Sequence, residues 1–136
     1  MFKKLLLPII IVFVCIQVLD GLFHGVILSG LYQQSAAIWR PKADMDRMMW
    51  IIYLSTFLQT IGFVYIYYKL INEKSPFRGL WFGLTFGFTV GVGMGYSTYA
   101  MLPMPYALAF SWFIGCIIIY GIAGLVLGLI MKEKKA

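Results

Sequence analysis

Two ionisable side chains lie close together inside the first long apolar segment of the chain. Asp20 and His24 are four positions apart, so on a helix they share one face and lie one turn apart. An ionisable group inside a membrane is costly unless it faces protein, water or a ligand, and such residues therefore indicate a functional site. The pair predicts a site for a proton, a cation or a small ligand, with Asp20 as its charged group and His24 as the residue that tunes it.

Other polar side chains are expected to gather with this pair in the outer half of a membrane. Together they predict an outward-opening polar pocket, lined by Gln17, Asp20, His24, Ser55, Gln59, Tyr96 and Tyr99. The alternative is structural. Asp20 would then accept hydrogen bonds from His24, from a tyrosine hydroxyl or from Gln59, and the network would fix the register of the helices.

The chemistry that these residue types offer is narrow. No second carboxylate and no Ser-His-Asp arrangement accompanies Asp20, so we expect no hydrolytic activity and no cofactor. One histidine cannot supply two axial haem ligands. The glycines lie inside an apolar segment instead of following a strand, which argues against a dinucleotide or phosphate loop.

A copper site is a further alternative, because thioether ligands suit Cu(I). Near the expected outer face, close to His24, the sequence places Met45, Met48, Met49, Met101 and Met104. Methionine is also a common apolar filler at helix ends, and we favour that interpretation. Cys15 and Cys116 lie inside apolar segments, where we interpret them as small buried hydrophobic residues.

The elements that position these residues follow from hydropathy. The chain has 136 residues, of which 62% are hydrophobic and 12% charged, so lipid must be the solvent for much of its surface. Four apolar segments, at about residues 5–31, 48–68, 77–102 and 106–131, are each long enough to span a membrane as a helix. We therefore expect one all-α domain over residues 1–136, an antiparallel bundle of four transmembrane helices with an outer loop at residues 32–47.

Basic residues are distributed unevenly between the two sides of this expected bundle. One side receives Lys3, Lys4, Lys69, Lys74, Arg78, Lys132, Lys134 and Lys135, and the other Arg40, Lys42 and Arg47. The positive-inside rule then places both termini in the cytoplasm. The same distribution argues against nucleic acid as the partner of a chain with net charge +6, because its charges flank apolar segments. The first segment has no small-residue cleavage site after it, so we expect an uncleaved span.

Glycines in the third segment repeat at every fourth position. Small residues at this spacing allow close approach of another backbone, and we assign this role to Gly79, Gly83, Gly87, Gly91 and Gly95, with Gly124 and Gly128 in the fourth segment and Gly21 and Gly25 in the first. The spacing leaves open whether the partner of the third segment is the fourth helix, the first helix or another subunit.

The layout resembles small bacterial four-helix integral membrane proteins of unknown function. The resemblance rests on Leu19-Asp20 with Tyr32 downstream, on the run Gly95-Tyr96-Ser97-Thr98-Tyr99, and on the small residues of the fourth segment. It implies the four-helix fold in a bacterial inner membrane and no assigned activity. We expect a non-catalytic packing or accessory subunit of a membrane assembly, or a homo-oligomer. The alternative is a small proton- or cation-coupled transporter, or a ligand-binding membrane protein, that uses Asp20 and His24.

Overall fold

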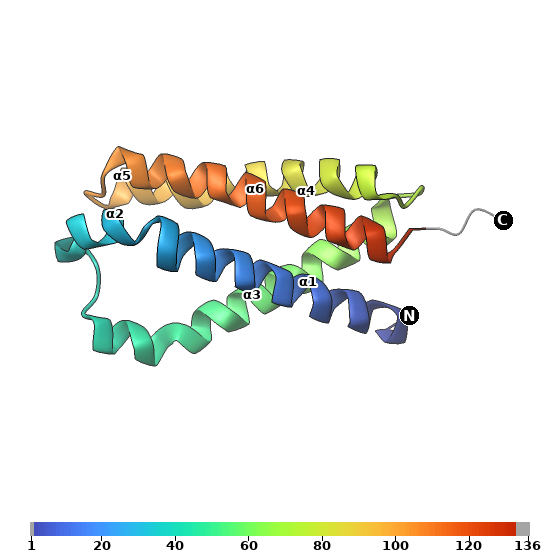
Figure 1. The fold of residues 1–136 in the computed structure, drawn as a ribbon, viewed down its shortest axis with the longest axis horizontal. Helices are drawn as coiled ribbons and strands as arrows, with labels where there is room; N and C mark the ends of the chain where they lie inside the picture. Colours follow the sequence, from blue (N-terminus) through green and yellow to red (C-terminus); the bar gives the residue numbers. More distant parts are fainter. Residues whose placement is uncertain (1, 133–136) are drawn as a thin grey trace.

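The chain folds into long helical rods that run alternately in opposite directions (Figure 1). The computed structural model describes the backbone of residues 2–132 and the side chains of residues 4–132. Every element in this part of the chain is a helix: α1 (Phe2–Leu22), the π-helix η1 (Phe23–Ile27), α2 (Ser29–Gln34), the 3₁₀-helix η2 (Ala36–Ile38), α3 (Lys42–Leu70), α4 (Pro76–Gly91), the π-helix η3 (Val92–Ser97), α5 (Thr98–Met101) and α6 (Tyr106–Ile130).

Three helical stretches in the described part of the chain are long and apolar enough to cross a membrane. They are Lys4–Ile27, Lys42–Leu70 and Tyr106–Ile130. These helices indicate a membrane protein. The fourth expected span is divided into α4, η3 and α5, and α4 alone has 16 residues, fewer than the roughly 20 that a membrane requires.

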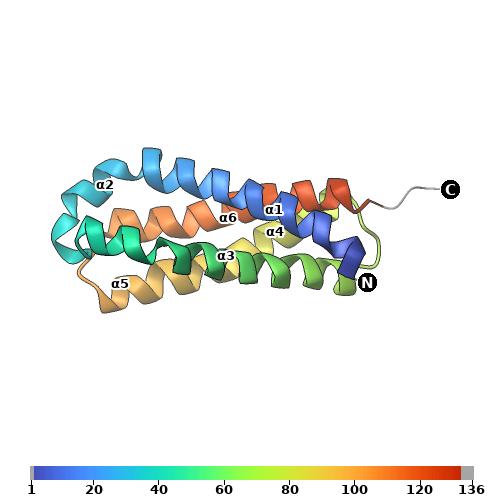
Figure 2. The ribbon, with the colours of Figure 1, turned by 90° about the horizontal axis from the view of Figure 1, so that it is seen from below.

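Both ends of the described chain lie at the same end of the bundle. The start of α1, the end of α6 and the turn between α3 and α4 gather there, and α2, η2 and the turn between α5 and α6 lie at the opposite end (Figures 1 and 2). We call these the terminal end and the α2 end. Of the basic residues expected on the terminal side, Lys134 and Lys135 lie outside the described residues.

The loop expected at residues 32–47 is mostly helical. α3 begins at Lys42 instead of residue 48, and only Trp39 to Pro41 separate it from η2. Pro41 precedes the first turn with φ −51°, Asp44 lies in that turn, where it complements the helix dipole, and Lys42 forms an ion pair with Asp46 at 2.8 Å. Charged residues of the expected loop therefore support the first turns of α3.

Ser75 and Pro76 determine where the third long helix begins. Pro76 is its first residue, and the hydroxyl oxygen of Ser75 accepts a hydrogen bond from the backbone N–H of Arg78 at 3.2 Å. The hydroxyl of Tyr67 on α3 also donates to the carbonyl of Ser75 at 3.0 Å. The turn between α3 and α4 is thus fixed from both sides.

The glycine row of α4 and η3 faces α6. A methyl group added to Gly79 or Gly83 would overlap a backbone carbonyl oxygen of α6, that of Gly124 or Tyr120. Further along, a methyl group on Gly91 would lie 2.8 Å from the carbonyl oxygen of Phe113. The contacts move back along α6 as they advance along α4, so the two helices are antiparallel. The partner that the sequence left open is the last helix of the same chain.

The small residues Gly21 of α1 and Gly25 of η1 are in a different environment. Gly21 and Gly25 are exposed, and in the described part of the chain no atom lies within 4 Å of a methyl group added to either. They make no close helix contact within the described residues, because they lie on the side of the helix away from Ile16, which is buried. A role for these two glycines in packing against another subunit stays a prediction.

The main apolar core lies between α1, α3 and α6 toward the terminal end. Its buried members are Leu5, Val12, Ile16, Phe63, Val64, Tyr67, Ile119, Tyr120, Ala123 and Leu127. A second, smaller cluster of Leu28, Met104, Leu108, Ala109 and Trp112 lies toward the α2 end. The half of α3 nearest the α2 end diverges from α1 and α2 (Figure 1) and has no buried residue before Thr60.

Candidate functional site

The chain around His24 is a π-helical turn. α1 ends at Leu22, two residues after Asp20, and the wider turn η1 follows directly with Phe23 and His24 at its start. Such turns occur frequently at functional sites. The ring of Phe23 fills the space above Gly115 of α6, where an added methyl group would overlap it. Because Gly115 has no side chain, η1 can approach α6 closely at this position.

His24 makes its hydrogen bond to Tyr32 instead of Asp20. Its Nδ1 lies 2.6 Å from the hydroxyl oxygen of Tyr32, and the direction of donation depends on the imidazole tautomer. The indole N–H of Trp112 on α6 donates to the same hydroxyl at 2.8 Å. Tyr32 lies on α2, beyond the last residue of the first candidate span. Burial raises the pKa of Tyr32 to about 12, although the bond from Trp112 opposes this shift; the charge of Asp20 adds to it.

Asp20 faces α6 without a hydrogen-bonding partner. The half-buried carboxylate lies close enough to Tyr32, Cys116 and Tyr120 for its charge to act on all three. Within residues 4–132, however, it makes no hydrogen bond or ion pair, because His24 is bonded to Tyr32. The network that would have made Asp20 purely structural is therefore not formed as expected.

Gln59 links α3 to α6. The hydroxyl of Tyr120 donates a hydrogen bond to Oε1 of Gln59 at 2.6 Å, across 61 positions of sequence. Tyr120 also lies within electrostatic range of Asp20. We call Asp20, Gln59, Cys116 and Tyr120 the Asp20 cluster; it joins α1, α3 and α6.

Sequence reasoning did not select Tyr120 or Cys116 as site residues. A signal was present, because Tyr120 is the single hydroxyl-bearing side chain after Ser111 in the fourth apolar segment. Cys116 precedes it by one helical turn and therefore shares its face.

The remaining predicted pocket residues lie in other surroundings. Gln17 is half-buried and Ser55 is exposed on α3. Tyr96 and Tyr99 pack against Tyr106 at the α2 end of α6, and the Tyr96 and Tyr106 hydroxyls are 3.4 Å apart. The structure thus joins Gln59 to the surroundings of Asp20 through Tyr120, and it places the two tyrosines of the third long helix in an aromatic group of their own.

The methionines proposed as weak copper ligands do not share one environment. Met104 is buried in the smaller core cluster, whereas Met45, Met48 and Met101 are exposed. In the described part of the chain, no three His, Cys, Asp or Glu side chains gather in a way that could hold a metal ion. The Asp20 cluster offers one carboxylate, one thiol, one phenol and one amide. These groups can bind a proton, a cation or a hydrogen-bond donor.

Comparison with protein-family models, with curated proteins and with solved structures gives no match for this chain.

Proposed function

We propose that this chain is a non-catalytic membrane protein that binds a proton or a small cation at Asp20, from the outer side of the membrane. In this proposal α4, η3 and α5 together form a fourth span beside the three apolar helices. The membrane is the inner membrane of a bacterium, as the resemblance of the sequence implies. The reaction is binding, or binding coupled to transport, and requires no bond to be made or broken.

The proposed orientation rests on charge. Among the described side chains, the terminal end carries Lys4, Lys69, Lys74, Arg78 and Lys132 against Glu73. The α2 end carries Arg40, Lys42 and Arg47 against Asp44 and Asp46. Because basic residues are retained on the cytoplasmic side, the terminal end is cytoplasmic in the proposal and the α2 end is outside.

The observation that carries the proposal is that the half-buried carboxylate of Asp20, in an apolar helix, makes no hydrogen bond or ion pair within residues 4–132. A carboxylate removed from water needs hydrogen bonds or a counter-charge, and leaving it unpaired costs several kcal/mol (about 3 or more). The expected protein partners are engaged elsewhere, His24 with Tyr32 and Gln59 with Tyr120. A proton, a cation or water must therefore be the missing partner of the Asp20 carboxylate. Of these three, a proton or a cation is a ligand whose binding can be the function of the protein.

Reaction with dicyclohexylcarbodiimide tests the proposal. This lipophilic reagent modifies protonated carboxyl groups in apolar surroundings, and intact-mass spectrometry counts the adducts on the purified protein in mild detergent. We expect one adduct per chain on Asp20, because Asp44, Asp46 and Glu73 lie on exposed surface at the two ends and the remaining acid, Glu133, belongs to a polar, lysine-rich sequence instead of an apolar segment. Labelling should fall as the pH rises, because the reagent requires the protonated acid.

Two variants make the result specific. Asp20→Asn should abolish the adduct and keep the helical content, whereas Asp46→Asn should leave labelling unchanged. An unlabelled wild-type protein, or an adduct that survives in Asp20→Asn, would contradict the proposal. Suppression of labelling by NaCl but not by an equal concentration of choline chloride would identify a small cation as the ligand. A purely pH-dependent adduct would identify a proton.

A second candidate function is that of an accessory subunit or homo-oligomer, and the open glycines of α1 and η1 favour it. α6 covers the glycine row of α4, so that row is not available to another chain. Gly21 of α1 and Gly25 of η1 lie about one turn apart on the exposed side of the first long helix, and no other part of the described chain packs against them. Small residues at this spacing permit close contact between membrane helices.

Gly21→Leu tests this second function. If α1 pairs with another helix there, the variant should lower the fraction of oligomer found by chemical cross-linking in membranes. Gly62→Leu on α3 is the matched control, because an added methyl group there also meets nothing within 4 Å. Equal cross-linking in all three proteins would remove the support that the open glycines provide.

A further inference from the structure

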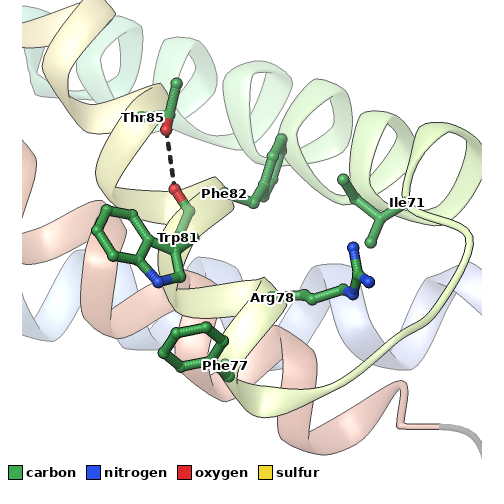
Figure 3. Close-up of a pocket in the computed structure, with 6 residues that line it drawn as sticks. All are labelled: Ile71, Phe77, Arg78, Trp81, Phe82 and Thr85. Carbon is green, nitrogen blue, oxygen red and sulfur yellow. Dashed lines mark hydrogen bonds between the residues drawn. The ribbon is translucent and has the colours of Figure 1, made fainter.

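A cavity of about 510 Å³ lies at the terminal end of the bundle, away from the Asp20 cluster. It is formed between the first turns of α4 and the residue that follows α3, and is lined by Ile71, Phe77, Arg78, Trp81, Phe82 and Thr85 (Figure 3). Its volume lies in the range of small-molecule sites, about 300–1,000 Å³. None of these residues belongs to the site predicted from the sequence.

The walls of this cavity are mainly apolar and aromatic. Phe82 forms the inner wall, held by a ring contact of 4.7 Å to buried Phe63 of α3. Phe77 and Trp81 flank the opening and are 66% and 56% exposed, so the chain itself does not cover them. Thr85 contributes a hydroxyl to this wall, and that hydroxyl already donates a hydrogen bond to the carbonyl of Trp81. The cavity therefore suits a hydrocarbon chain along its wall.

The positively charged side chain of Arg78 lies at the edge of this cavity. The guanidinium of Arg78 lies beside Ile71 (Figure 3) and forms an ion pair with Glu73 at 2.7 Å. Both partners of that pair are exposed, at 55% and 79% of their side chains, and exposed pairs contribute little and exchange readily. Arg78 is thus held near the opening by a partner that a stronger acceptor such as phosphate can replace.

We propose that this cavity binds one anionic phospholipid of the leaflet at the terminal end, with its phosphate on Arg78 and an acyl chain along Trp81 and Phe82. Three observations specify the ligand: an arginine suited to phosphate, a directly adjoining apolar wall, and an excess of basic residues at this end of the bundle. Tryptophan at the level of the headgroups is typical of such a boundary. A soluble anion would use the arginine but leave the apolar wall without a partner.

Native mass spectrometry of the full chain tests this site. The protein is purified in mild detergent with equal amounts of phosphatidylglycerol and phosphatidylcholine, and the retained lipids are counted. We expect one phosphatidylglycerol per chain, retained about fivefold over phosphatidylcholine, as one basic residue at an anionic surface implies. Arg78→Gln should remove this preference, and Arg47→Gln at the α2 end should preserve it.

Glu73 provides a variant with the opposite effect. Because Glu73 competes for Arg78, Glu73→Gln should raise the retention of phosphatidylglycerol above that of the wild type. Arg78 and Glu73 are both exposed, so these variants should keep the wild-type helical content, which circular dichroism verifies. A gain in one variant and a loss in the other cannot come from partial unfolding.

Three results would overturn the proposal. Equal retention of the two lipids by the wild type would show no selection of the anionic headgroup. Unchanged selection in Arg78→Gln would remove the arginine from the site. Displacement of the lipid by millimolar inorganic phosphate would identify a soluble anion as the ligand.

Discussion

Replacement of Gly83 by alanine tests the close contact between α4 and α6. The added methyl group would overlap the carbonyl oxygen of Tyr120, and it would lie 2.8 Å from the carbonyl carbon of that residue and 3.1 Å from Cα of Gly121. All three atoms belong to the backbone of α6, so no side-chain rotation relieves the overlap and the helices must separate. Overpacking of this kind costs about 1–3 kcal/mol, and we expect the upper part of that range.

The assay is unfolding of the purified protein by sodium dodecyl sulfate in mixed micelles, with helical content followed by circular dichroism. Gly83→Ala should unfold at a lower detergent fraction than the wild type. Gly21→Ala is the matched control, because it adds the same methyl group to the open side of α1. Its free energy of unfolding should stay within about 0.5 kcal/mol of the wild-type value.

Two outcomes would refute this reasoning. Wild-type stability of Gly83→Ala would mean that the helices are farther apart than the structure places them. An equal loss in Gly21→Ala would mean that the effect belongs to glycine replacement in general and does not depend on contact with α6.

Three further predictions concern the α2 end. Tyr32→Phe removes the hydroxyl shared by His24 and Trp112, and should lower the free energy of unfolding by about 1–3 kcal/mol, while Tyr53→Phe on exposed α3 should have no effect. The raised pKa of Tyr32 stabilises the folded state below pH 10, and this contribution should be lost between pH 10 and about 12 in the wild type but not in Tyr32→Phe. Gly115→Ala should destabilise the protein by about 1–3 kcal/mol, and by less when Phe23 is already leucine, because the ring of Phe23 occupies that space.

Local rules predicted the parts of this fold that depend on near neighbours. Ser75 and Pro76 are local signals for the start of α4, which lies one residue before the expected segment 77–102, and the five glycines of the third long helix indicated close contact with a second helix. That second helix could not be identified from sequence, because a glycine groove accepts any backbone. The start of α3 was misplaced for a related reason: Lys42 and Asp46 are as typical of a solvated loop as of a first helical turn.

The candidate site could be predicted only in part, because its geometry depends on the π-helical turn η1, and no periodic pattern in the sequence indicates such a turn. An uninterrupted α-helix would stack His24 above Asp20, but the π-helical turn η1 begins between them and His24 bonds to Tyr32. Tyr120 was overlooked because its contact with Gln59 spans 61 positions of sequence. The ionisable group itself was the reliable signal, since an acid in an apolar segment needs a specific environment wherever it lies.

Cross-linking between α1 and α6 tests most directly whether Asp20 faces the interior of the bundle. In a Cys15→Ser background, Asp20→Cys places a thiol opposite the natural Cys116, on which the charge of Asp20 acts. A short bifunctional thiol reagent should then join positions 20 and 116 within one chain, as peptide mass spectrometry would show. Val18→Cys is the control, because Val18 is 56% exposed on another side of α1. Cross-linking from position 18, or none from position 20, would contradict the inward orientation of this carboxylate.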